Sequence, residues 1–250
     1  MSLWIKICAN TSLADARLAA EAGADAVGFV FAPSPRRVTP EEVAKIVPHL
    51  PAALEKIGVF VDAAFEEIRA TVESAGLTGV QLHFDAPAAL PAQLRARFGP
   101  KLRILGVARF GAQPQLPALR SGDNFDREAA MPIAEEGMAF AAPFQDAYVD
   151  AVLVDSYSLT TRGGTGQSYD WGLAAVTLFQ VTGKNKIAAG GLTPENVAEA
   201  IATLHPWGVD VVSGVESAPG RKDPAKVRAF LAHARAALGP AGQSPTRPAK

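Results

Sequence analysis

The segment GADAVGFVFAPSPRRVTPEEVAKIV, residues 23–47, contains one complete strand, loop and helix. Its run AVGFVF (26–31) is apolar on both faces, which is typical of a parallel strand that is buried on both sides. The helix that follows has a clear start, because Thr39 is a favourable N-cap and Pro40 fits the first helical position before EEVAKIV. This segment therefore predicts an α/β fold with a parallel sheet.

The same unit recurs along the chain, as short β-rich runs alternate with Ala-rich amphipathic helical segments. Thr193 with Pro194 predicts a further helix start, and Gly23 and Gly76 are expected to end helices. Eight strand and helix pairs in 250 residues predict a single-domain (β/α)8 TIM barrel, with a doubly wound open sheet as the alternative. The expected strands are Leu3–Cys8, Ala26–Phe31, Lys56–Val61, Gly79–His83, Leu102–Ala108, Ala151–Asp155, Lys186–Ala189 and Val209–Ser213.

The barrel domain is expected to cover residues 1–238. From Phe110 to Tyr148 the chain is long for one connection, and its Pro, Gly and polar residues predict an extended segment at about 110–125 before the fifth helix. Residues 239–250, GPAGQSPTRPAK, have no apolar periodicity and are expected to form a disordered tail.

Composition narrows the classes of partner and compartment. A formal net charge of -1 provides no general attraction to nucleic acid or to an anionic membrane, so neither is expected as a partner. A single cysteine cannot form an internal disulfide, which fits a reducing cytoplasm. The N-terminus has no basic segment followed by an apolar run, and no apolar stretch approaches the roughly 20 residues of a membrane span. We therefore expect a cytoplasmic globular protein.

Four chemically capable side chains fall at the predicted C-terminal ends of strands, where (β/α)8 barrels carry their chemistry. They are Cys8, His83, Asp155 and Ser213. Each also has a structural interpretation: a buried cysteine often serves as a small apolar residue, and Asp155 can simply bond to the loop after it. For His83 the structural role is favoured on position alone.

Three glycine-rich loops follow the last strands: RGGTGQSYDW (162–171), AAGGLTPEN (188–196) and VVSGVES (211–217). In this fold the loops after strands 7 and 8 commonly bind phosphate through backbone N–H groups, and glycine permits the close approach. Ordinary turns are the alternative for any single loop. The predicted phosphate-binding residues are Gly163, Gly164, Gly190, Gly191, Ser213 and Gly214.

Two arginines, Arg36 and Arg37, stand in the loop after the second strand, on the same predicted face as these glycines. An arginine pair is usually a solvated surface feature, but one guanidinium here can grip a carboxylate with two parallel hydrogen bonds. No metal is expected, because the four histidines are scattered and no histidine and carboxylate cluster has ligand spacing.

Together, several motifs resemble the phosphoribosylanthranilate isomerase family of tryptophan biosynthesis in order and spacing. They touch six of the eight predicted strands: KIC (6–8), GADAVGFVFAPSPRRVTP (23–40), VQLH (80–83), VDS (154–156), GGTGQSYDW (163–171), AGGLTPENV (189–197) and VDVVSGVESAPGRKD (209–223). The resemblance implies a cofactor-free Amadori rearrangement of N-(5-phosphoribosyl)anthranilate, a small phosphorylated substrate. It leaves a monomer and a homodimer both open.

The resemblance also implies residue roles. Cys8 aligns with the family's general base, Asp155 with its general acid and Arg36 with the arginine that grips the anthranilate carboxylate, while His83 joins the substrate-binding residues. For this chemistry we expect the pKa of Asp155 to be raised by burial or nearby phosphate charge. We expect the pKa of Cys8 to be lowered by cations or helix N-termini.

Three positions depart from the family pattern. Ala9 and Phe84 stand where the family has glycine, and Gln167 stands where it has lysine. Activity is still favoured, since the acid, the base and the phosphate loops are present. Three alternatives remain: a related isomerase of histidine biosynthesis, which should carry a carboxylate in place of Cys8; a flavin-binding barrel oxidoreductase; and a divergent or non-catalytic barrel that only binds phosphosugars.

Overall fold

The structure is a computed structural model of the 250-residue chain. The residues that it describes are 2–83, 86–110, 147–156, 171–176, 179 and 183–238. The extended segment predicted at about 110–125 lies outside these residues except for Phe110, and the tail predicted at 239–250 lies outside them entirely.

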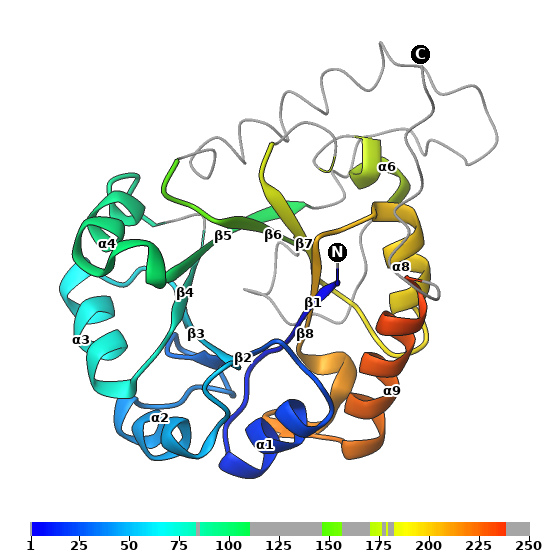
Figure 1. Cartoon of the computed structure of the whole chain (residues 1–250), viewed down its shortest axis with the longest axis horizontal. Helices are drawn as coiled ribbons and strands as arrows, with labels where there is room; N and C mark the ends of the chain where they lie inside the picture. The colour runs from blue at the N-terminus through cyan, green and yellow to red at the C-terminus, as the bar shows by residue number, and fades with distance from the viewer. Residues whose placement is uncertain are drawn as a thin grey trace.

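Eight parallel strands form a closed barrel in sequential order, with β8 paired to β1 (Figure 1). Closure excludes the open-sheet alternative and confirms the predicted (β/α)8 fold. The strands are β1 (Trp4–Ile7), β2 (Ala26–Val30), β3 (Glu55–Phe60), β4 (Gly79–Leu82), β5 (Arg103–Phe110), β6 (Ala151–Ser156), β7 (Asn185–Ala188) and β8 (Gly208–Val211). Each expected boundary falls within two residues of the observed one.

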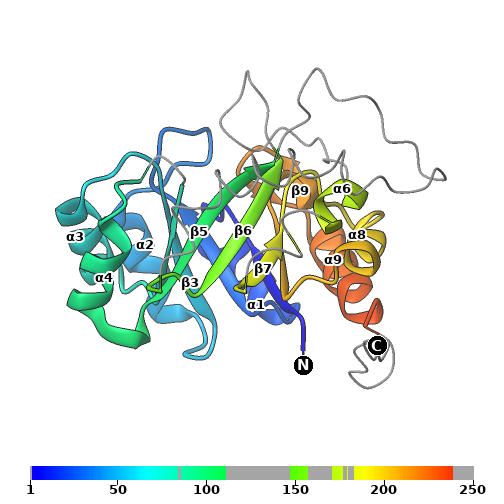
Figure 2. The same ribbon diagram turned by 90° about the horizontal axis from the view of Figure 1, so that it is seen from above.

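Helices surround the ring of strands (Figure 1), and Figure 2 shows the N-terminus at the end of the barrel where the strands begin. The helices are α1 (Leu13–Glu21), α2 (Pro40–Ile46), α3 (Phe65–Ala75), α4 (Leu90–Phe98), α6 (Trp171–Val176), α8 (Val197–Leu204) and α9 (Pro224–Ala236), with 3-10 turns η1 (Val47–His49), η2 (Gly99–Lys101) and η4 (Ser213–Val215). None of the described helices has the length and apolar character to cross a membrane.

Most of the predicted helix signals hold. Thr39 and Glu42 form a reciprocal capping box at the start of α2, and Gly76 ends α3 in the left-handed conformation with φ 68°. The helix start predicted at Thr193 with Pro194 is wrong, because α8 begins at Val197. The side chain of Asn196 explains the delay: its Oδ1 accepts from the Thr193 N–H at 2.8 Å, which closes a turn before the helix.

Two layers of buried apolar side chains stabilise the barrel. The larger lies between sheet and helices and includes Ile5, Val27 and Phe230. The smaller is a cluster whose members alternate along the strands with residues of the outer layer, so it fills the inside of the ring. Its buried members are Trp4, Ala26, Ile57, Leu105, Val107, Ala151, Leu153, Ile187 and Ala189.

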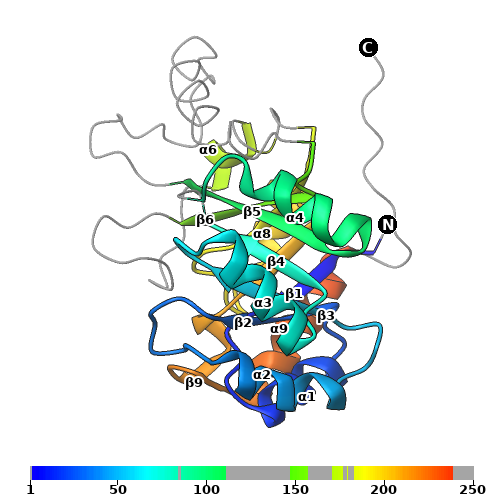
Figure 3. The same ribbon diagram turned by 90° about the vertical axis from the view of Figure 1, so that its left-hand side faces the viewer.

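A short hairpin follows β8, formed by β9 (Glu216–Ala218) and β10 (Arg221–Lys222). Figures 2 and 3 both place β9 at the same end of the barrel as the loop after β2. Thr11, in the loop after β1, donates from its hydroxyl to the Gly220 carbonyl at 2.6 Å. The hairpin is therefore bonded to the loop after β1, and Glu216 of β9 also accepts hydrogen bonds from Arg36 in the loop after β2.

Candidate active site

Cys8 follows β1 directly and is 3% exposed at the C-terminal end of the strand. Its backbone N–H donates to the Val211 carbonyl at 2.9 Å, which continues the pairing of β1 with β8 by one residue. Residues two apart on a strand share a face, so the Cys8 side chain follows Trp4 and Lys6 into the barrel interior. The thiol thus lies where the interior opens to the mouth of the barrel.

Gly28 in β2 makes room for this thiol. A Cβ atom built on Gly28 would lie 2.4 Å from the Cys8 sulfur, closer than such atoms approach in proteins, and 3.0 Å from Cε of Lys6. Glycine inside a strand often marks such a close approach. The Cys8 and Lys6 side chains therefore meet against the bare backbone of β2.

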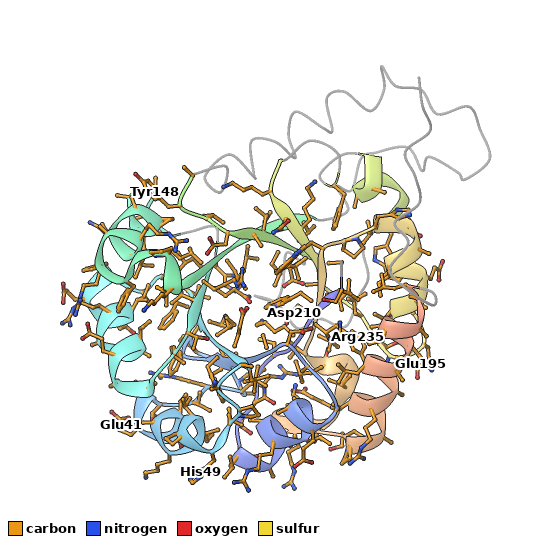
Figure 4. The ribbon with its side chains drawn as sticks, viewed as in Figure 1. Glu41, His49, Tyr148, Glu195, Asp210 and Arg235 are labelled. Atoms are coloured by element: carbon orange, nitrogen blue, oxygen red, sulfur yellow. The ribbon has the colours of Figure 1, made fainter. Side chains whose placement is uncertain are left out.

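Beneath Cys8 the barrel interior holds a buried polar group made of Lys6, Gln81 and Asp210. The Lys6 ammonium is fully buried and donates to Asp210 Oδ1 and Gln81 Oε1, each at 2.9 Å. Figure 4 places Asp210 inside the ring of strands. We refer to these three residues as the interior polar layer.

The structure reverses one expectation for Cys8. Burial raises the pKa of the Cys8 thiol above its ordinary value; the Lys6 ammonium opposes the rise and the Asp210 carboxylate adds to it. The lowered pKa expected from the sequence is therefore wrong for the free protein. The expectation failed because the sequence did not show how completely the barrel would enclose the thiol.

Arg36 is held by Glu216, the first residue of β9. The Arg36 Nε donates to both Glu216 carboxylate oxygens at 2.9 and 3.1 Å, and Nη2 donates to Oε2 at 2.7 Å. Only 15% of the Arg36 side chain is exposed, whereas Arg37 is an exposed residue. The paired hydrogen bonds expected for a ligand carboxylate are thus made to Glu216, along the edge of the guanidinium that carries Nε and Nη2.

Lys222 completes this ionic cluster from β10, with its fully buried ammonium 3.3 Å from Glu216 Oε1. Burial works against ionisation of Glu216, but the hydrogen bonds from Arg36 and the charge of Lys222 hold the pKa of Glu216 below its ordinary value. Burial lowers the pKa of Lys222, and Glu216 opposes this. The Glu216 carboxylate therefore offsets part of the positive charge of both Arg36 and Lys222 at the edge of the barrel mouth.

Asp155 and His83 occupy the strand ends where the sequence places them. Asp155 is the fifth residue of β6 and follows Ala151 and Leu153 on the inward face. His83 follows β4 directly and is 8% exposed. In the ring, β7 and β8 lie between the strand of Asp155 and that of Cys8, so the two groups stand on different walls of one mouth.

The loops after β7 and β8 pack directly on each other. Gly190 and Gly191 adopt left-handed conformations with φ 77° and 65°, which few other residues tolerate. A Cβ atom on Gly214 would lie 1.9 Å from the Leu192 carbonyl oxygen, so only glycine lets η4 meet the neighbouring loop. Ser213 begins that turn. The predicted loops therefore form one continuous backbone surface.

Other predicted features fall outside the described residues. These are Gly163, Gly164, Phe84 and Gln167. Within the described ranges, no group of three or more histidine, cysteine or acidic side chains is arranged to hold a metal ion.

Comparison with known proteins matches the same chain to one family. The family model described as N-(5'phosphoribosyl)anthranilate (PRA) isomerase matches residues 5–117 and 130–233. The chain belongs to this family. It is 41% identical over 229 residues to the N-(5'-phosphoribosyl)anthranilate isomerase of Pelobacter propionicus, covering 91% of this chain and 93% of that protein. It is 39% identical over 233 residues to the enzyme of a Geobacter species, covering 92% and 97%.

Solved structures of phosphoribosylanthranilate isomerases agree. The enzyme of Thermotoga maritima superposes with a TM-score of 0.75 at 31% identity, covering 93% of this chain and 98% of that chain. A second structure, a complex with reduced 1-(o-carboxyphenylamino)-1-deoxyribulose 5-phosphate, superposes with a TM-score of 0.72 at 30% identity and the same coverage. The family named from the sequence motifs is confirmed.

Ala9 shows how this chain accommodates a departure from the phosphoribosylanthranilate isomerase pattern. It has φ 60°, a left-handed conformation that suits the glycine usual there. The next residue, Asn10, is fully buried and donates from its side-chain amide to the Ile7 and Gly28 carbonyls at 2.8 and 3.2 Å. These bonds hold the loop after β1 in place despite the unfavourable conformation of Ala9.

The sequence reasoning missed several members of this isomerase site, although signals for them exist. Gly28 interrupts an apolar strand, and Lys6 and Asp210 are charged residues at inward-facing positions of otherwise apolar strands. Glu216 and Lys222 carry no comparable local signal. The role of Glu216 depends on its contact with Arg36, 180 residues earlier, and Lys222 joins the cluster through Glu216.

Proposed function

We propose that this chain catalyses the Amadori rearrangement of N-(5'-phosphoribosyl)anthranilate to 1-(2-carboxyphenylamino)-1-deoxyribulose 5-phosphate. The observation that carries the proposal is the position of Cys8 and Asp155, at the ends of β1 and β6, in a barrel of this family. Residues 1–238 then form one catalytic domain. We place the enzyme in the cytoplasm, because a lone thiol base stays reduced there.

The reaction needs one acid and one base. Asp155, protonated when the substrate binds, donates its proton to the ribose ring oxygen as the C1–O bond breaks and an iminium forms at C1. The iminium acidifies the hydrogen on C2. Cys8, as a thiolate, removes that proton; the C–H electron pair forms a C1–C2 double bond and the iminium electrons return to nitrogen. The resulting enolamine ketonises to the product.

Substrate binding uses both sides of the mouth. The Nη1 side of Arg36 binds the anthranilate carboxylate, and Glu216 keeps the guanidinium fixed before the ligand arrives. The phosphate binds to backbone N–H groups of the loops at Gly190–Gly191 and Ser213–Gly214, and His83, Gly163 and Gly164 are the other proposed substrate-binding residues. Holding both ends places the ribose between Cys8 and Asp155.

Complementation tests the function in a cell. A bacterial strain that lacks phosphoribosylanthranilate isomerase should grow without tryptophan when it expresses this chain, and it should fail to grow when it expresses Cys8→Ser at the same level. Failure of the wild-type chain, present as folded protein, would favour a barrel that binds phosphosugars without turning them over.

Replacing Arg36 should weaken substrate binding. Arg36→Met removes a charged hydrogen bond, so we expect KM to rise about 10- to 100-fold with a smaller change in kcat. Glu216→Gln, which retains Arg36 but loosens its anchor, should raise KM less. The exposed Arg37→Met is the matched control and should leave KM near the wild-type value. Equal, small effects of Arg36→Met and Arg37→Met would remove Arg36 from the binding site.

Inorganic phosphate should inhibit competitively, and Gly191→Ala should weaken that inhibition about fivefold or more, because a Cβ atom blocks approach to the backbone. Gly99→Ala is a control for the strain of a positive φ: Gly99 has φ 67°, and a Cβ atom there meets open space. Only Gly191→Ala should lose phosphate affinity. Equal phosphate affinity in the two variants would place the anion elsewhere. Gly214 is unsuitable here, since a side chain would displace the Leu192 backbone.

A further inference from the structure

The interior polar layer is unusual for a barrel, whose interior is normally filled by bulky branched apolar side chains. Lys6 and Asp210 are 0% and 5% exposed, and Gln81 is 5% exposed. A buried charge is costly unless it is paired and hydrogen-bonded, and a buried ion pair is often no more stabilising than apolar residues of the same volume. Stability alone therefore does not explain why these charges are here.

Their position relative to Cys8 suggests another reason. Lys6 precedes Cys8 by two residues on the inward face of β1, and Asp210 stands directly opposite Lys6 on β8, at hydrogen-bonding distance. The Cys8 sulfur and Cε of Lys6 both lie within 3.0 Å of the point where a Gly28 Cβ would be. The ammonium is thus fixed directly beneath the thiol.

The other charged groups that act on Cys8 are already compensated. Lys222 of the β9–β10 hairpin and Arg36 of the loop after β2 both interact electrostatically with Cys8. Glu216 binds both cations at 2.7 to 3.3 Å, which reduces their combined field at the sulfur. Lys6 and Asp210 are therefore the two charged residues with the largest electrostatic effect on the Cys8 thiol.

We propose that Lys6 and Asp210 are positioning residues that set the charge state of Cys8: the Lys6 ammonium stabilises the thiolate, and Asp210 with Gln81 holds that ammonium beneath the sulfur. The proposal rests on the proposed function, in which Cys8 is the base. Lys6 stays protonated throughout the reaction. When the thiolate takes the C2 proton, the S–H bond forms and the buried Lys6–Asp210 pair remains as a neutral unit.

The two residues must act in opposite directions if the effect is electrostatic. Lys6→Met removes the cation that favours the thiolate, so the thiolate should appear at a pH about one unit or more higher. Asp210→Asn removes an anion that repels it, so the thiolate should appear at lower pH. If the two residues had only a structural role, the two variants would not shift the thiol titration in opposite directions.

The chain offers a direct measurement, because Cys8 is its only cysteine. Thiolate absorbance near 240 nm is titrated in the full-length protein, and the titration of Cys8→Ser is subtracted to remove the tyrosine contribution. Lys56→Met is the matched control: Lys56 is also buried, but its ammonium donates to the Pro51 and Ala52 carbonyls, and its removal should leave the thiol titration unchanged.

The proposal is overturned if Lys6→Met leaves the thiol titration unchanged, or if Lys6→Met and Asp210→Asn shift it in the same direction. Should Lys6→Met fold poorly, the double variant Lys6→Met with Asp210→Leu removes both charges at similar volume. It should still shift the thiolate to higher pH, and an unchanged titration there would equally refute the proposal. The titration contains no substrate, so its result is independent of the turnover assay. An unchanged titration would refute the role of Lys6 and Asp210 without refuting the isomerase activity, and an absence of turnover would refute the proposed function without affecting the titration.

Discussion

Cys8→Ser is expected to slow turnover by a factor on the order of 100 or more while the barrel remains folded. Serine is nearly the same size, so it fits against Gly28, but an alcohol holds its proton far more tightly than a thiol does. The measurement is kcat under saturating substrate, with thermal unfolding to confirm that the fold is retained. A Cys8→Ser enzyme with near wild-type kcat, under conditions where chemistry limits the rate, would make Cys8 a structural residue.

The same assignment predicts a pH dependence. Because burial raises the pKa of Cys8, only a minor fraction of the free protein carries the thiolate at neutral pH. The base must be deprotonated while Asp155 stays protonated, so kcat/KM should have a bell-shaped pH dependence whose alkaline decline begins only above the ordinary pKa of a cysteine thiol. An alkaline decline that begins near neutral pH would contradict a thiolate base with a raised pKa.

Asp155→Asn is expected to reduce kcat by a factor on the order of 100 or more, with a smaller change in KM. Asparagine has the same shape but has no acidic proton to deliver to the ribose ring oxygen. Asp150→Asn provides a matched control on the residue just before β6, where the carboxylate pairs with Arg95 and accepts from the Ile104 N–H at 2.7 Å. It should lower stability while preserving kcat.

The Asp155 comparison separates chemistry from folding. If Asp155→Asn retains kcat near that of the wild type, another group supplies the proton and the acid must be sought elsewhere at the mouth. If both aspartate variants lose kcat equally and unfold at lower temperature, the loss reflects damage to β6 rather than loss of an acid.

The barrel was predictable because its signals are local. Strands buried on both faces, capped helices and glycine stops repeat along the chain, and each depends on neighbouring residues. Even the one misplaced helix start has a local cause, since Asn196 forms a turn with Thr193 that competes with the helix. Cys8 and Asp155 were placed at the barrel mouth by the same reasoning, because a strand end fixes where its last side chain lies.

The electrostatics of the site were not predictable in this way. Lys6 pairs with Asp210 across 204 positions of sequence, and Arg36 pairs with Glu216 across 180. Neither pairing is visible until the barrel closes. The direction of the Cys8 pKa was therefore predicted incorrectly, and the pairing of Arg36 with Glu216 was not anticipated, although the position of Arg36 in the loop after β2 was.

The central claim is that this chain isomerises N-(5'-phosphoribosyl)anthranilate, and the most direct test is turnover of that substrate in solution. The labile substrate is generated freshly in the cuvette, and its anthranilate fluorescence is followed with and without the purified protein. We expect a protein-dependent loss of fluorescence that is proportional to enzyme concentration and nearly abolished in Cys8→Ser. Fluorescence that decays at the spontaneous rate in the presence of folded wild-type protein would contradict the account.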